Sequence, residues 1–98
     1  MNQQDAIEIL RRHETTLRAR GVRHAGLFGS VARGNAGPDS DIDILIDLEP
    51  DAPLDVYTYT GIKRYIASLF PQRVDIVSRD ALKLHLRRPA EADVLYAF

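Results

Sequence analysis

The sequence predicts a small α/β (α+β) domain in which helices and strands alternate around one sheet. Apolar residues recur at helical spacing in three stretches, and short apolar runs of strand length lie between them. Glycine or proline marks most of the boundaries. A chain of 98 residues suffices for one domain with a modest core, so we expect a single domain over residues 1–98.

The first half of the chain is expected to contain two helices and two strands. Residues 3–20 have one apolar stripe, and Gly21 is expected to end this helix. The stripe consists of Ala6, Ile7, Leu10, His13 and Leu17. A strand over 22–28, a brief helix over 30–34, a turn-rich loop over 35–40 and a strand over 41–47 follow.

The second half begins after Pro50 and Pro53 with a helix over 54–70. Its apolar positions are Val56, Tyr59, Ile62, Ile66 and Leu69. A strand over 74–77 comes next, then a helix that Ser78 caps and Pro89 ends, while residues 90–98 suit a short helix or an edge strand. Because a helix joins the strands over 41–47 and 74–77, we expect these two strands to be parallel.

The most informative stretch runs from Gly29 to Asp43. Asp41 and Asp43 alternate on one strand, so both carboxylates point to the same face. Close carboxylates repel each other, and a divalent cation such as Mg²⁺ removes that penalty by taking oxygen ligands. Upstream, Gly29 lets the backbone approach a ligand, and Ser30 begins a short helix whose N–H groups suit a phosphate. The combination indicates phosphoryl chemistry on a nucleotide.

These residues carry a family resemblance. Gly29-Ser30, ten intervening residues and Asp41-Ile42-Asp43 resemble the signature of the DNA polymerase β nucleotidyltransferase superfamily. Residues 30–34 and 40–45 are similar to its minimal nucleotidyltransferase branch, and the resemblance spans nearly the whole chain. It implies a polymerase β-like fold with a mixed sheet flanked by helices. The family has a third carboxylate on a later strand, for which Asp75 in residues 73–77 is the candidate.

The resemblance also implies a mechanism with two Mg²⁺ ions, or Mn²⁺ in their place. Asp41, Asp43 and Asp75 would be the catalytic metal ligands, and Asp75 would lie nearest the acceptor hydroxyl. The nucleotide would contact Gly29, Ser30, Arg33 and Ser40. For Arg33, a contact with phosphate and a salt bridge to a nearby aspartate are both open. The products would be a nucleoside monophosphate on the acceptor and pyrophosphate.

Minimal nucleotidyltransferases are commonly paired with a HEPN-domain toxin, for which they act as antitoxin. The resemblance therefore implies transfer of AMP from ATP to a tyrosine hydroxyl of such a partner. Three alternatives stay open: a small-molecule, antibiotic-type nucleotidyltransferase with a separate acceptor-binding subunit, a non-catalytic antitoxin that acts by occlusion, and an inactive acidic surface. Fold and motif identify the chemistry better than the acceptor.

Composition limits the other function classes. The formal net charge is -1, and seven of the fourteen acidic residues fall between Asp39 and Asp55, which argues against stable nucleic-acid binding. The absence of cysteine excludes disulfides and thiolate metal sites. No apolar run has membrane-spanning length and the N-terminus does not resemble a signal peptide, so we expect a cytoplasmic protein without membrane contact.

The remaining polar and aromatic residues give weaker signals. The three histidines lack metal-ligand spacing, and the tyrosines of the helix over 54–70 favour packing over base stacking. Lys83, Arg87 and Arg88 form a basic patch that suits either solvent or an acidic partner.

Overall fold

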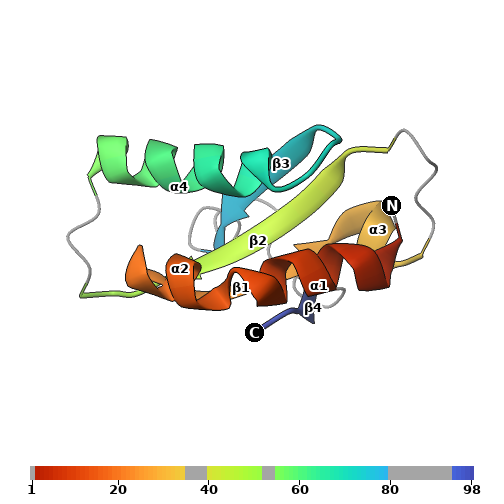
Figure 1. Cartoon of the computed structure of the whole chain (residues 1–98), viewed down its shortest axis with the longest axis horizontal. Helices are drawn as coiled ribbons and strands as arrows, with labels where there is room; N and C mark the ends of the chain where they lie inside the picture. The colour runs from red at the N-terminus through yellow and green to blue at the C-terminus, as the bar shows by residue number, and fades with distance from the viewer. Residues whose placement is uncertain (1, 35–39, 52–54, 80–93) are drawn as a thin grey trace.

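A four-stranded mixed sheet organises the fold (Figure 1). The computed structural model describes residues 2–34, 40–51, 55–79 and 94–98. The strands are β1 (Val22–Phe28), β2 (Ile42–Leu48), β3 (Val74–Ser78) and β4 (Leu95–Tyr96). The helices are α1 (Gln3–Arg12), α2 (Glu14–Ala19), α3 (Gly29–Ala32) and α4 (Val56–Ser68). Within the described ranges, no helix is both long and apolar enough to span a membrane.

The strand order is β3-β2-β1-β4. β2 and β3 are parallel, whereas β1 is antiparallel to both β2 and β4. The predicted α+β class and the predicted parallel pairing are therefore confirmed. Of the two possibilities for residues 90–98, the edge strand is found in the described part, residues 94–98. The close approach of β4 to β1 requires glycine at position 26. A Cβ there would lie 2.8 Å from the Leu95 carbonyl oxygen.

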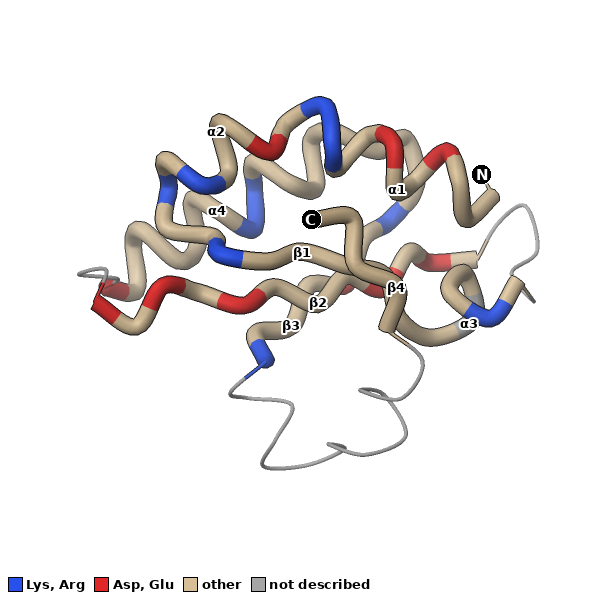
Figure 2. Tube along the Cα trace, turned by 90° about the horizontal axis from the view of Figure 1, so that it is seen from below, with Lys and Arg blue, Asp and Glu red and all other residues tan. Residues whose placement is uncertain are grey.

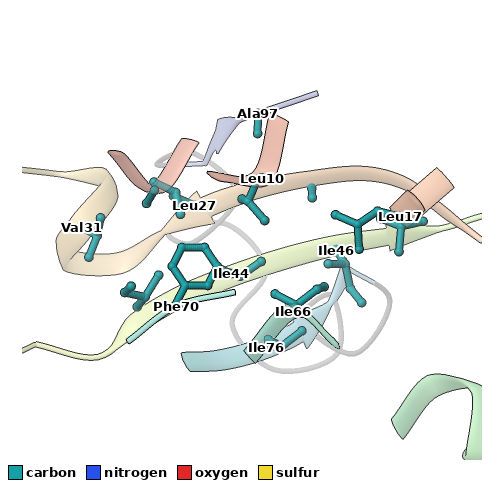
Figure 3. Close-up of a cluster of buried hydrophobic side chains, with 14 of the residues drawn as sticks. Leu10, Leu17, Leu27, Val31, Ile44, Ile46, Ile66, Phe70, Ile76 and Ala97 are labelled. Atoms are coloured by element: carbon teal, nitrogen blue, oxygen red, sulfur yellow. The ribbon is translucent and has the colours of Figure 1, made fainter. Parts of the chain in front are cut away.

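The hydrophobic core lies between the sheet and the helices α1, α2 and α4, which cover one face of the sheet (Figures 2 and 3). Ile42, Ile44 and Ile46 alternate along β2 and are all fully buried against these helices. Leu10 and Leu17 reach the same core from α1 and α2, and Ile66 does so from α4. The residues between the isoleucines of β2 consequently point to the opposite face, as the alternation predicted.

The predicted helix over 3–20 is wrong in one respect, because it is interrupted at His13. This residue leaves the helical conformation, with φ -107° and ψ 13°, and a second helix starts at Glu14. Its Nδ1 atom lies 2.9 Å from the Tyr65 hydroxyl, within hydrogen-bonding distance. The break therefore coincides with a contact to α4, a helix far away in the sequence.

Two other expectations for α4 are also wrong. Val56 was expected on the apolar stripe, but it is 78% exposed in the first turn, and the first fully buried residue of the helix is Ile62. Tyr57 is 88% exposed and therefore not packed, unlike Tyr59 and Tyr65. Ser78, which was expected to cap the next helix, is the last residue of β3. Residues 80–89 of that expected helix, with His85, Lys83, Arg87 and Arg88, lie outside the described residues, as do residues 35–39 of the expected loop.

Candidate active site

The turn between β1 and α3 brings the chain next to the start of β2. Gly29 has φ +71°, a left-handed conformation that glycine adopts without steric cost. α3 starts at this glycine and is placed by the burial of Val31 and Ala32, while the Gln3 side chain hydrogen-bonds to the Ala32 carbonyl. The short helix and the start of β2 lie side by side at one end of the sheet (Figure 2).

Gly29 is in close contact with the Asp43 carboxylate. A Cβ built on Gly29 would lie 2.2 Å from Oδ2 and 3.1 Å from Cγ of Asp43. Any side chain at position 29 would therefore displace the carboxylate. Glycine is therefore required at position 29 for a second reason besides close approach to a ligand: it leaves the space that the Asp43 carboxylate occupies.

Three aspartates lie at the same end of the sheet. Asp43 on β2 and Asp75 on β3 are direct register partners in the parallel pair, so they share one face. Asp41 directly precedes β2, which begins at Ile42. Asp43 is partly buried, whereas Asp41 and Asp75 are exposed.

The electrostatics of Asp43 follow from this arrangement. Burial raises the pKa of the Asp43 carboxyl above its ordinary value, and the negative charges of Asp75 and Asp41 raise it further. The guanidinium of Arg33, just after α3, acts in the opposite direction. The three carboxylates are therefore close enough to repel one another. Such perturbed acidic groups are typical of functional sites that bind a cation.

The remaining predicted residues are placed near this point by their elements. Ser30 is the second residue of α3, and Arg33 is its C-terminal cap. Arg33 is close enough to influence Asp43 electrostatically, which favours neither of the two roles expected for it. Ser40 is partly buried just before Asp41.

The donor chemistry fits a hard divalent cation. In the described part of the chain, no group of three His, Cys, Asp or Glu side chains is arranged as a ready metal cage. Mg²⁺ does not need one, because it typically takes one or two protein carboxylates and completes its coordination with water and substrate phosphates. Asp41, Asp43 and Asp75 have the carboxylate oxygens that such a cation prefers. Burial, followed by repulsion from Asp75 and Asp41, raises the pKa of Asp43, and a cation would remove the repulsive part.

Other polar groups have structural partners. His13 meets Tyr65, and the His24 ring packs edge-on against Tyr96. Asp47 is buried on β2, where it accepts a hydrogen bond of 2.8 Å from Arg23.

A groove between α4 and β3 was not anticipated from the sequence. It includes Asp75 from β3 and two neighbouring cations, Lys63 and Arg64, from α4. The sequence contained one indication of this groove, namely that Lys63 and Arg64 are the only charged residues of α4.

The structure thus combines a mixed sheet with paired aspartates on β2 and β3 beside a Gly-Ser turn. The sequence matches the family model for the nucleotidyltransferase domain over residues 10–96. It is 39% identical over 89 residues to the protein adenylyltransferase MntA of Thermococcus cleftensis, covering 90% of this chain and 88% of that protein.

Two solved structures have the same fold. One, of a candidate minimal nucleotidyltransferase, is 30% identical and superimposes with a TM-score of 0.68, covering 97% of this chain and 95% of the other. The second is a tri-AMPylated HEPN toxin from Shewanella oneidensis in complex with an MNT antitoxin. The matched chain is 19% identical, which shows the fold alone, with a TM-score of 0.62 and coverage of 94% and 71%.

The chain belongs to the nucleotidyltransferase domain family, and the expected likeness to its minimal members is confirmed. Its family activity is nucleotidyl transfer.

Proposed function

We propose that this protein is a Mg²⁺-dependent antitoxin that transfers AMP from ATP to a tyrosine hydroxyl of a HEPN-domain toxin in the cytoplasm. The observation that carries the chemistry is the register pairing of Asp43 with Asp75, with Asp41 directly before β2 and Gly29 against Asp43. The acceptor class is supported by the 39% identical relative, which is named a protein adenylyltransferase.

Asp41, Asp43 and Asp75 would hold the Mg²⁺ ions, and Asp75 is assigned to the acceptor side of the site. When bound, Mg²⁺ supplies positive charge that neutralises the triphosphate and favours ionisation of the acceptor hydroxyl. Gly29 and Ser30 would contact the outer phosphates through the backbone of the β1–α3 turn. Arg33 and Ser40 flank the same site and are assigned to the nucleotide.

In this proposal, the site residues position the tyrosine hydroxyl and the α-phosphate of ATP for an in-line displacement. The tyrosine oxygen forms a bond to the α-phosphorus of ATP, the bond from that phosphorus to the β-phosphate oxygen breaks, and pyrophosphate leaves. The hydroxyl proton passes to Asp75 or to water held by it. Because a tyrosine hydroxyl has a pKa of about 10, its deprotonation must be assisted at neutral pH.

A HEPN toxin is the proposed partner, and modification would block its activity. A structure with the same fold contains an MNT antitoxin together with an AMPylated HEPN toxin. The competing small-molecule acceptor would require a pocket shaped by a separate subunit. The competing occlusion mechanism would require no chemistry at the aspartates.

The test is to incubate the protein with its co-purifying partner, Mg²⁺ and ATP labelled at either the α- or the γ-phosphate. The proposal predicts label on the partner from α-labelled ATP only, loss of labelling in EDTA, and a modified tyrosine by tandem mass spectrometry. Partner that stays unlabelled while being inhibited would favour occlusion. Label on an added aminoglycoside, with none on the partner, would favour the small-molecule alternative.

A further inference from the structure

A groove of about 330 Å³ lies between α4 and β3. Its lining residues come from the two elements in turn, namely Thr60, Lys63, Arg64, Ala67, Val74, Asp75 and Ile76. Asp75 also lines this groove, although it shares with Asp43 the face of the sheet opposite to α4. The groove therefore runs along the same strand, β3, that carries the aspartate assigned to the acceptor side, and an extended chain at this strand would present alternate residues to the two faces.

The groove is positively charged on its helical side. Lys63 and Arg64 are the only charged residues of α4, and both are exposed. The Lys63 ammonium lies 5.4 Å from the centre of the Tyr59 ring. In the described part of the chain, neither cation forms an ion pair with a carboxylate. Both charges are thus available to an incoming anionic group.

The strand side of the groove can accept an extended chain. Among the described strands, β3 has a hydrogen-bonded neighbour on one side only, which is β2. The other edge of such a strand presents backbone N–H and C=O groups, and peptides commonly add to edges of this kind. The lining residues that the structure describes include no aromatic ring on which a nucleic-acid base would stack.

We infer that this groove docks an extended, acidic segment of the acceptor protein next to the tyrosine that receives AMP. The inference rests on the proposed function, since it adds the sequence context that the acceptor presents. An acceptor approaching Asp41, Asp43 and Asp75 enters a negative potential. Lys63 and Arg64 offset that repulsion for acidic residues beside the tyrosine and so select for them.

Binding of labelled peptides tests the groove without relying on catalysis. Three extended peptides have one tyrosine flanked by glutamates, by glutamines or by lysines, and a single-stranded oligonucleotide is the fourth probe. Fluorescence anisotropy should show that the glutamate peptide binds most tightly. The double variant Lys63→Gln/Arg64→Gln should weaken its binding about tenfold, the scale of two exposed ion pairs.

The matched control is Arg12→Gln/Arg18→Gln, which removes the same charge from two exposed arginines on α1 and α2. This control should bind the glutamate peptide like the wild type. NMR shift changes caused by the peptide should map to residues 60–67 and 74–76. Equal binding of the three peptides, no binding, an equal loss in the control, or tighter binding of the oligonucleotide at Lys63 and Arg64 would each overturn the inference.

Steady-state labelling of the HEPN partner separates this inference from the proposed function. Lys63→Gln/Arg64→Gln should raise KM for the partner about tenfold and leave kcat and ATP affinity unchanged. If the wild type labels the partner and the variant does so with the same KM, the groove assignment fails and the proposed function stands. If the wild type labels no partner, the proposed function fails, and the peptide assay still decides the groove.

Discussion

Replacing Asp43 by asparagine should stabilise the metal-free protein at neutral pH, although it removes a proposed catalytic group. Burial and the charges of Asp75 and Asp41 raise the pKa of Asp43 in the folded state. An acid whose pKa is higher when folded than when unfolded destabilises the fold in its ionised form. Asparagine has nearly the same shape without the charge, so the variant escapes this penalty.

The size of the effect follows from the spacing of the strands. Neighbouring strands are about 4.8 Å apart, and two unit charges at that distance repel by about 0.9 kcal/mol at the dielectric constant of water. Two aspartates act on Asp43 and Arg33 offsets part of their effect, so the net gain should be about 1 kcal/mol. For a domain of this size that corresponds to about 4–8 °C in Tm.

Thermal unfolding followed by circular dichroism in EDTA measures this gain. The difference between variant and wild type should be full at neutral pH. It should shrink as the pH falls through the raised pKa towards the ordinary value of 3.8, because Asp43 is then protonated in both states. Asp47→Asn is the control, since the same change removes the charge of a buried carboxylate that pairs with the partly exposed Arg23 and should lower Tm. A lower Tm for Asp43→Asn at neutral pH would refute the reasoning.

Three further results are expected. Asp75→Asn should lower kcat and alter the pH–rate profile while keeping most of the ATP affinity, and normal labelling by this variant would place the proton acceptor elsewhere. Gly29→Ala should lose nucleotide binding far more than Gly34→Ala, although both glycines have positive φ and similar strain of about 1–2 kcal/mol, because only the first Cβ meets Asp43; equal losses would contradict this. Mg²⁺ with a non-hydrolysable ATP analogue should raise the Tm of the wild type more than that of Asp43→Asn, and equal shifts would oppose the metal assignment.

Most of the fold could be predicted because local patterns determine it. The alternation of isoleucines with aspartates sets the two faces of β2, and the helix between β2 and β3 fixes their parallel direction. The break at His13 could not be predicted, since the sequence there has neither glycine nor proline and the contact with Tyr65 is long-range. The exposure of Val56 also depends on where α4 begins to pack, which periodicity does not record.

Part of the candidate site could also be predicted from the sequence, and part of it could not. Asp41, Asp43 and Gly29 lie close together in the sequence, so spacing and a short turn were enough to suggest them. Asp75 was suggested by the family resemblance, and the parallel pairing then predicted that it lies beside Asp43. The Lys63–Arg64 groove was missed because it exists only once α4 is placed beside the edge of β3, and an exposed pair of cations on a helix is ordinary by itself.

The most direct test of the aspartate site is the single-turnover rate of AMP transfer to the partner by the wild type and by Asp43→Asn. Both proteins are first shown to be folded by their Tm, so a loss of rate cannot be attributed to unfolding. The account predicts a decrease of at least about a hundredfold, the scale of losing a principal electrostatic contact in the transition state. A rate for Asp43→Asn within about threefold of the wild type, roughly 0.7 kcal/mol in barrier height, would contradict it.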